Sequence, residues 1–373
     1  MFNYHHMLGF DFNKNLSLDY LAISIRSLVL SMVGMFIPIY ILTLGYSFNE
    51  LIIYYLFIMF FRMILVPFMA KLLPIIGIKY SIIIHFPLLV ILYLLLFSSS
   101  TFGISIYWSL IPYVLSLVTF WPAFHTDFIN SSDKKNRGHE VGFLWISNLG
   151  LRALGPIIAA LILTFFSFSV LFMIVSIITL IAIIPMYKSD EIYPKSKFTF
   201  KRLYHKSNLK DSIFFFSEGI VSLSEVFIWP LFIYLLFKSF LIVGYAGSLI
   251  YASTLIVIFT ASKYTDSNKK FKLMSYGSKL YALSWILKIY TKTSLLAYFF
   301  SAFSGISRTF FMTPYMSTFY DKSSKNALEH VTIRETFVGL GHFVLLLILL
   351  LTKSFVVLFA LTSIMTLIQG KYR

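Results

Sequence analysis

The sequence predicts an all-α integral membrane protein whose twelve transmembrane helices form two pseudo-symmetric six-helix bundles. Three observations support this fold class: the composition, a series of long apolar runs, and a repeat at a fixed spacing. Hydrophobic residues make up 58% of the chain and charged residues 12%, and the mean hydropathy is +0.84. A water-soluble domain is about a quarter charged. Lipid must therefore cover much of the apolar surface of this chain.

The apolar runs are each roughly 18–27 residues long, which is enough for a helix to cross a ~30 Å hydrocarbon core. They are continuous rather than alternating, and this pattern favours helices over strands. The predicted spans are 18–44, 48–73, 77–98, 104–130, 139–164, 168–187, 212–237, 240–262, 271–290, 294–320, 330–351 and 353–370.

The second half of the chain repeats landmarks of the first half at an offset of 192 residues. The matched pairs are Asp19 and Asp211, Pro38 and Pro230, Lys71 and Lys263, and Pro122 and Pro314. Two parallel copies of a multi-helix unit in a membrane protein indicate a site between halves that move against each other.

The repeat divides the chain into four predicted segments. Residues 1–17 form an N-terminal segment on the cytoplasmic side, and residues 18–187 form the first six-helix bundle. Residues 188–210 form a basic cytoplasmic linker, and residues 211–373 form the second bundle. The mixture of aromatic and basic residues in the linker fits an amphipathic stretch on anionic lipid, and it fits a solvated tether equally well.

The formal net charge of +16 is distributed in a way that indicates membrane orientation. Basic residues gather in alternate connections, around 134–137, 188–210, 263–272 and 322–325, whereas the other connections are short and poor in charge. The positive-inside rule makes the basic side cytoplasmic and, with twelve crossings, puts both termini there. We expect a multi-pass protein of the plasma or inner membrane. No stretch is long enough for a folded basic module that binds nucleic acid.

The residue types argue against a cofactor, a metal site and an enzyme. The chain contains no cysteine and no His-x-x-x-His pattern. A membrane-embedded enzyme would need a metal cluster or a nucleophile with its base at membrane depth. We therefore predict no cofactor, no metal ligands and no catalytic residues.

Two short motifs and the overall architecture carry a resemblance to a known family. Ser262-Lys-Tyr-Thr-Asp266, followed by Lys269 and Lys270, is similar to a Gly-x-x-x-Asp signature with basic residues after it. Gly150-Leu-Arg-Ala-Leu-Gly155-Pro156 in the fifth span is similar to a glycine–proline motif. Together with the six-plus-six split, these motifs resemble the major facilitator superfamily of secondary transporters. The arginine that many proton antiporters of the family carry in their fourth helix is missing here.

The resemblance implies that helices 1, 4, 7 and 10 line a central cavity and that the two halves tilt to open it to each side in turn. Small residues in the glycine–proline motif allow close helix approach, and Arg152 within it is expected to serve packing or gating.

Charges inside apolar spans are costly unless they are paired or face water, so they mark candidate sites. Glu218 and Glu225 stand two helical turns apart, on a stripe that also contains Ser222 and Trp229. The glutamates are candidates to carry protons or to bind a cationic group. The alternative is structural: Glu218 neutralises Arg26, which occupies the same position in the first repeat.

Arg308 lies near the middle of the tenth span and is a second candidate. Its guanidinium can hold a carboxylate or phosphate through two oxygens. Pairing with a glutamate of the seventh span is the alternative.

Two cytoplasmic latches are also predicted. Asp266 would accept hydrogen bonds from the amide end of the fifth helix near Arg137, where the helix dipole favours an anion. Lys71 would pair with Glu329 or Glu335 at the mirrored position.

These features predict a secondary transporter that moves a small amphipathic or lipophilic molecule by alternating access, with proton coupling through Glu218 or Glu225. The expected partners are this substrate, membrane lipids and protons, and the expected state is a monomer. One alternative is a lysophospholipid flippase of the same fold. A non-transporting membrane protein and a membrane-embedded enzyme are the others.

Overall fold

The computed structural model describes residues 14–131, 137–188, 191, 193–194, 198–204, 206–267 and 269–372. Within these ranges the backbone alone is described at 14–20, 131, 137–147, 202, 204 and 206–209. The regular elements among the described residues are helices.

Helices of the first half follow the predicted spans. They are α1 (Lys14–Val33), α2 (Ile37–Thr43), α3 (Phe48–Ile76), α4 (Ile78–Phe102), the short 3-10 helix η2 (Ile106–Ser109), α5 (Leu110–Ser131), α6 (Arg137–Phe165) and α7 (Phe168–Tyr187).

The second half begins after a short helix in the linker, η3 (Phe200–Tyr204). It contains α8 (Lys206–Leu223), the π-helical turn η4 (Ser224–Ile228), α9 (Trp229–Phe237), α10 (Phe240–Thr265), α11 (Lys270–Lys288), α12 (Ser294–Ser323), α13 (Ala327–Thr352) and α14 (Phe355–Gln369).

Ten helical segments of the described chain are long and apolar enough to cross a membrane. The remaining two predicted spans correspond to α11 and α14. Every 18-residue stretch of α11 contains three lysines, and α14 is apolar but has only 15 residues. The arrangement is that of a multi-pass helical membrane protein and is consistent with twelve crossings.

The first span of each half is interrupted where the repeat places a proline. Pro38 stands at the start of α2, just after the break at residues 34–36. Pro230 stands at the start of α9, directly after the π-helical turn. Proline has no backbone N–H and its ring collides with the preceding turn, so both spans change their helical geometry there.

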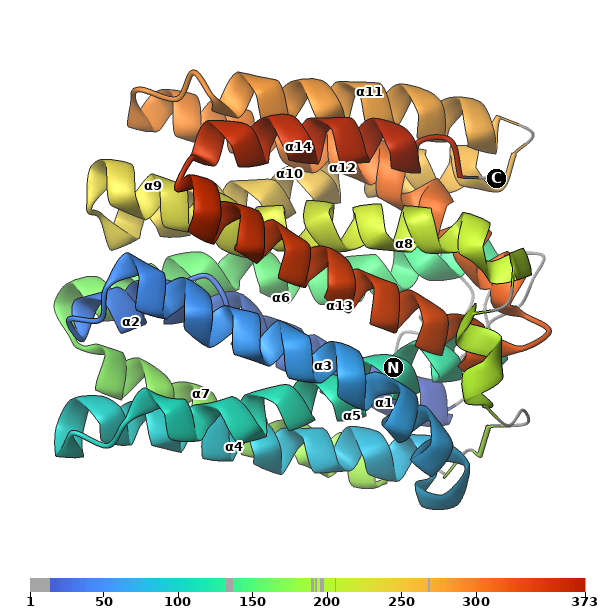
Figure 1. The fold of residues 1–373 in the computed structure, drawn as a ribbon, viewed down its shortest axis with the longest axis horizontal. Coiled ribbons are helices and arrows are strands. Elements are labelled where there is room, and N and C mark those ends of the chain that lie inside the picture. The colour runs from blue at the N-terminus through green and yellow to red at the C-terminus, as the bar shows by residue number, and fades with distance from the viewer. Residues whose placement is uncertain are drawn as a thin grey trace, which may run out of the picture.

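The two halves use matching helix contacts (Figure 1). In the first half α1 packs on α6, and α4 packs on α5 and α7; in the second half α8 packs on α13, and α11 packs on α12 and α14. The halves meet where α6 lies against α10 and α3 lies against α13. These matched sets are what two pseudo-symmetric six-helix bundles produce, and they leave the interior faces of both bundles opposite each other.

Alternate connections gather at the same end of the molecule. In Figure 1 the turns after α4, α6, α9 and α13 lie at the left, and the C-terminus lies at the right with the starts of α8 and α13. At that second end Glu191 of the linker accepts hydrogen bonds from the backbone N–H groups of Lys79 (2.8 Å) and Tyr80 (3.0 Å). A carboxylate there is favoured by the positive end of the α4 dipole, so Glu191 fastens the linker to the first bundle.

Candidate functional site

A cavity of about 400 Å³ lies between the two halves. Its walls come from α1, α3, α4, α5 and α6 of the first half and from α8, α9, α10, α12 and α13 of the second. The predicted lining helices, which are α1, α5, α8 with α9, and α12, all contribute. Helices α3, α4, α6, α10 and α13 complete the walls, so the predicted set was incomplete.

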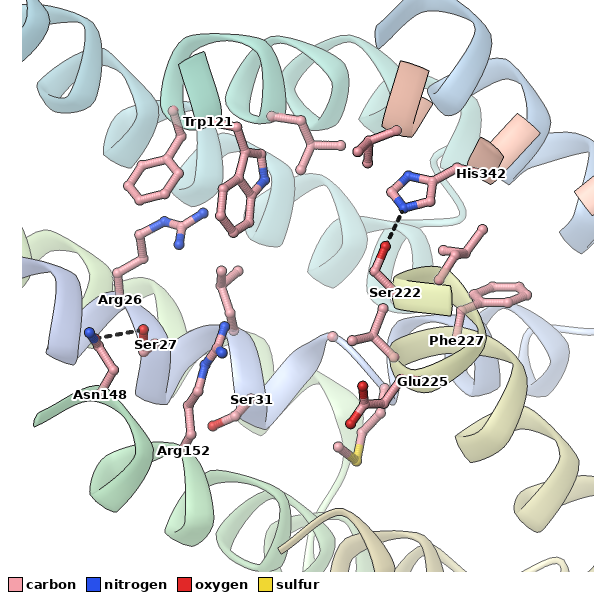
Figure 2. A pocket seen from close by; sticks show the side chains of 18 of the residues that line it. Arg26, Ser27, Ser31, Trp121, Asn148, Arg152, Ser222, Glu225, Phe227 and His342 are labelled. Carbon is pink, nitrogen blue, oxygen red and sulfur yellow. Dashed lines mark hydrogen bonds between the residues drawn. The ribbon is translucent and has the colours of Figure 1, made fainter. Parts of the chain in front are cut away.

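All six residues predicted to line a substrate or proton cavity are on its wall: Arg26, Glu218, Ser222, Glu225, Trp229 and Arg308. Arg152 and Glu335, which were expected to act in gating, line it as well. Figure 2 shows Arg26, Ser27, Ser31, Asn148 and Arg152 together on one side of the cavity and Ser222, Glu225, Phe227 and His342 on the other.

Glu225 is paired with Arg308. The Nε of Arg308 donates to Glu225 at 2.6 Å, and the hydroxyl of Tyr281 donates to the same carboxylate oxygen at 3.0 Å. Two interpretations of Arg308 were open, and the structure contains the second: Arg308 pairs with a glutamate of the seventh predicted span. The Arg308 side chain keeps 21% of its surface exposed, so the pair still borders the cavity.

The expected pair of Arg26 and Glu218 is wrong. Glu218 accepts from two nitrogens of Arg334 and from the Tyr315 hydroxyl. Arg26 instead donates from Nε to Nε2 of His85 at 2.7 Å, and its guanidinium lies 3.3 Å from the centre of the Phe120 ring. Equivalent positions in the two repeats place Arg26 and Glu218 at a similar depth in the membrane. The Arg26 side chain, however, points toward His85 of α4 and Phe120 of α5 in its own bundle.

A buried ion-pair network joins the halves between α3 and α13. Arg62 donates to Glu335 at 2.5 Å, and Glu335 also accepts from Arg334 at 2.6 Å. Arg62 further contacts Nδ1 of His342 at 3.0 Å, and Nε2 of the same ring lies 3.0 Å from the Ser222 hydroxyl. Burial makes this network costly to break, since removing one partner leaves an uncompensated charge.

Sequence reasoning missed Arg334 of the cavity wall. Arg334 lies within an apolar span, so the rule that singled out Glu218 would have found it too. Lys288 of α11 is fully buried; its Nζ donates to Ser304 at 3.0 Å and lies 3.6 Å from the centre of the Trp285 ring. Arg334 was passed over because it lies near the start of its predicted span, 330–351.

The predicted latch from Lys71 to Glu335 is also wrong, because Glu335 is committed to Arg62 and Arg334. The Nζ of Lys71 lies 4.1 Å from the centre of the Phe200 ring, where the linker packs on α3. The alternative partner, Glu329, is buried at the start of α13, and its pairing with Lys71 stays a prediction. Asp266 ends α10 and is exposed, and the side chain of Arg137 lies outside the described residues, so that latch stays a prediction.

The glycine–proline motif brings α6 close to two neighbours. A side chain at Gly155 would collide with Ser31 of α1, and a side chain at Gly244 of α10 would come within 2.7 Å of the Pro156 carbonyl. Gly150 differs, because a Cβ there would meet open space. Close packing of α6 therefore depends on Gly155 of the motif against α1 and on Gly244 of α10 against the motif's backbone.

Three cavity histidines contact other side chains: His85 binds Arg26, His342 binds Arg62 and Ser222, and His125 contacts the Tyr320 hydroxyl at 3.0 Å. Among the described residues, no three His, Asp or Glu side chains gather into a group that could hold a metal ion.

The helical bundles and the charged cavity at their junction define the class: a polytopic helical membrane protein built from two bundles. The chain has the fold of the major facilitator transporters. It is similar to the crystal structure of the human organic anion transporter MFSD10 (TETRAN), with a TM-score of 0.69 and 9% identity, over 96% of this chain and 98% of that one. It is also similar to a bacterial homologue of the iron transporter ferroportin, with a TM-score of 0.70 and 12% identity, over 95% and 97% of the two chains. No protein-family model and no curated protein sequence matches it.

Proposed function

We propose that the protein is a secondary transporter that moves a small amphipathic or lipophilic molecule across the membrane by alternating access. One observation carries the proposal: the cavity of about 400 Å³ lies between the halves and receives ionised side chains from both of them. This volume is within the ordinary range of small-molecule sites. A site at the junction of two repeats becomes exposed to each side of the membrane in turn when the bundles rock around it.

The walls favour an amphipathic substrate. Apolar and aromatic side chains from both halves line the cavity, including Leu30, Leu117, Phe124, Phe227 and Met312. Asn148 is the single carboxamide among the described lining residues. A sugar would need many neutral hydrogen-bonding groups, whereas an apolar body with one polar group matches these walls.

Proton coupling is assigned to Glu225 rather than Glu218. Glu218 is held by two guanidinium nitrogens and a tyrosine hydroxyl, all buried. Glu225 has a partly exposed partner, Arg308, beside the cavity. Protonation of Glu225 would neutralise the carboxylate and release Arg308 from the ion pair. Binding of a proton would in this way be coupled to a rearrangement of the cavity wall.

The proposed orientation places the basic connections, the linker and both termini in the cytoplasm, in a plasma or inner membrane. The proposed working unit is a monomer, because one chain supplies both bundles and the whole cavity. The similar solved structures are transporters, and this supports a role in transport rather than catalysis.

The first experiment is a thermal-shift screen of the purified protein against metabolites, drugs and lipids at two pH values, because a ligand that binds the folded state raises its melting temperature. Compounds that stabilise the protein are then tested for uptake into proteoliposomes. We expect small amphipathic compounds to stabilise it and to be taken up. Stabilisation by phospholipids alone, with lipid scrambling and no solute uptake, would replace this proposal with a lipid flippase.

A further inference from the structure

The cavity wall carries more positive than negative charge. Among its described residues are five arginines and three glutamates: Arg26, Arg62, Arg152, Arg308 and Arg334 against Glu218, Glu225 and Glu335. Each glutamate is already paired: Glu225 with Arg308, Glu218 with Arg334, and Glu335 with both Arg62 and Arg334. Arg26 and Arg152 are the two remaining arginines of the cavity wall, and no carboxylate among the described side chains forms an ion pair with either of them.

Arg26 is held in place by neutral groups. Nδ1 of His85 lies 2.8 Å from the Ser116 carbonyl, which can only accept, so Nδ1 carries the proton and Nε2 accepts from Arg26. The guanidinium is also stacked on Phe120. The Trp121 ring centre lies 5.4 Å from the guanidinium carbon. These contacts use Nε and aromatic rings, and none of them neutralises the charge. The two terminal nitrogens remain as donors toward the cavity.

Arg152 reaches the same part of the cavity from α6. Its Nε is buried and has no hydrogen-bond partner, and its guanidinium carbon lies 5.7 Å from the centre of the Tyr251 ring. A buried donor without a partner is costly, and a charged donor more so. Both guanidinium groups are positively charged and lie on the same side of the cavity, so they repel each other. An anion between them would relieve both costs.

The packing of α1 on α6 sets this arrangement. Gly155 allows Ser31 of α1 to approach α6, one turn beyond Arg152. One turn on the other side of Arg152, the hydroxyl of Ser27 donates to the Asn148 carboxamide oxygen at 3.0 Å. Figure 2 shows these neutral polar groups beside the two arginines, while Glu225 lies across the cavity.

We propose that Arg26 and Arg152 form an anion subsite, and that the substrate is a small amphipathic organic acid. Its carboxylate or sulfonate lies between the two guanidinium groups, which donate to its oxygens, and its apolar body lies against the aromatic and aliphatic walls. This inference rests on the proposed transport function, because it names the substrate class of the same cavity.

The test compares three ligands that share one ring system and differ in charge: naphthalene-1-sulfonate, 1-naphthalenemethanol and 1-naphthylmethylammonium. Binding is measured by calorimetry on the purified full-length protein in phosphatidylcholine nanodiscs. We expect the sulfonate to bind at least tenfold more tightly than the alcohol and the ammonium compound not to bind measurably. Equal affinity for the alcohol, or a preference for the cation, would overturn the proposal.

Variants then locate the subsite. Arg152→Gln is expected to weaken sulfonate binding at least tenfold, and Arg152→Lys less, because lysine keeps the charge and loses the planar fork. Lys263→Gln is the matched control, since it removes one positive charge from an exposed position on α10 outside the cavity. Unchanged sulfonate affinity in a folded Arg152→Gln protein, or an equal loss in Lys263→Gln, would refute the assignment. If Arg152→Gln does not fold, the ligand series and Arg152→Lys decide.

Failure of this inference can be told apart from failure of the transport proposal. Sulfonate binding that depends on Arg152, without uptake or exchange in proteoliposomes, would leave the subsite standing and reject transport. Uptake of a neutral or cationic compound, with no competition from the sulfonate, would leave transport standing and reject the anion subsite.

Discussion

Arg62 of α3 and Glu335 of α13 form a buried ion pair of 2.5 Å that joins the two halves of the chain. Glu335 also binds Arg334, whose guanidinium reaches Glu218 on α8. One carboxylate therefore connects α3 of the first bundle to two helices of the second. A movement that separates α3 from α13 must break this pair, and closing them restores it.

Glu335→Gln is expected to destabilise the protein by about 3–5 kcal/mol, because Arg62 would keep a buried charge without its counter-ion. Thermal unfolding of the purified protein measures the change. Lys270→Gln is the control: it removes the pair with Asp321, whose side chain is 42% exposed, and should cost less than about 1 kcal/mol. Similar losses in the two variants would show that the buried network contributes no more than a surface pair.

Gly219→Ala is expected to lower stability by about 1–3 kcal/mol, the usual range for overpacking. A Cβ at this position on α8 would collide with the Val338 carbonyl and lie 3.0 Å from Cα of Gly341, both of them backbone atoms of α13. Gly150→Ala is the matched control, because its Cβ meets open space and alanine favours the helix. A melting temperature of Gly219→Ala at or above that of Gly150→Ala would contradict the close packing of α8 on α13.

Glu225→Gln is expected to abolish substrate accumulation driven by a pH gradient and to leave downhill exchange in place, because glutamine cannot take up the coupling proton. Uptake into proteoliposomes with and without the gradient measures both activities. Glu50→Gln is the control, since glutamine can replace glutamate in the capping box that Glu50 forms with Ser47 at the start of α3. Gradient-driven uptake that persists in Glu225→Gln would exclude Glu225 as the proton carrier.

Single cysteines are expected to report opposite sides of the membrane at the two ends of the bundle. The natural chain has no cysteine, so Thr101→Cys in the last turn of α4 and Asn326→Cys just before α13 would each carry the one reactive thiol. Both positions are exposed. A membrane-impermeant maleimide added to intact cells should label Thr101→Cys alone, because the positive-inside rule places Asn326 in the cytoplasm. The reverse labelling pattern would invert the proposed orientation.

The helices and their order could be predicted from the sequence because hydropathy acts along a continuous stretch. The ten longest apolar helices follow predicted spans, and the breaks at Pro38 and Pro230 occur where the repeat places them. The shared stripe of Glu218, Ser222, Glu225 and Trp229 could be predicted for the same reason, since helical periodicity is local. All four residues line the cavity.

The partners of these charges could not be predicted in the same way. The repeat suggested Glu218 for Arg26, but His85 and Phe120 of the same bundle hold it. Glu335 was expected at a cytoplasmic latch with Lys71, and it lies at the junction of the bundles with Arg62. For Arg26 the depth was foreseeable and the direction of the side chain was not, and for Glu335 the partner and the depth both differ from the prediction.

The sequence by itself determined that this chain is a helical membrane protein, how its helices follow one another, and which ionisable side chains must lie at membrane depth. Only the tertiary structure decided which of those charges neutralise one another and which, namely Arg26 and Arg152, remain toward the cavity. The physical reason is the rotation of each helix about its own axis. Contacts with helices far away in sequence set that rotation, at approaches such as Gly155 on Ser31 and Gly219 on Gly341.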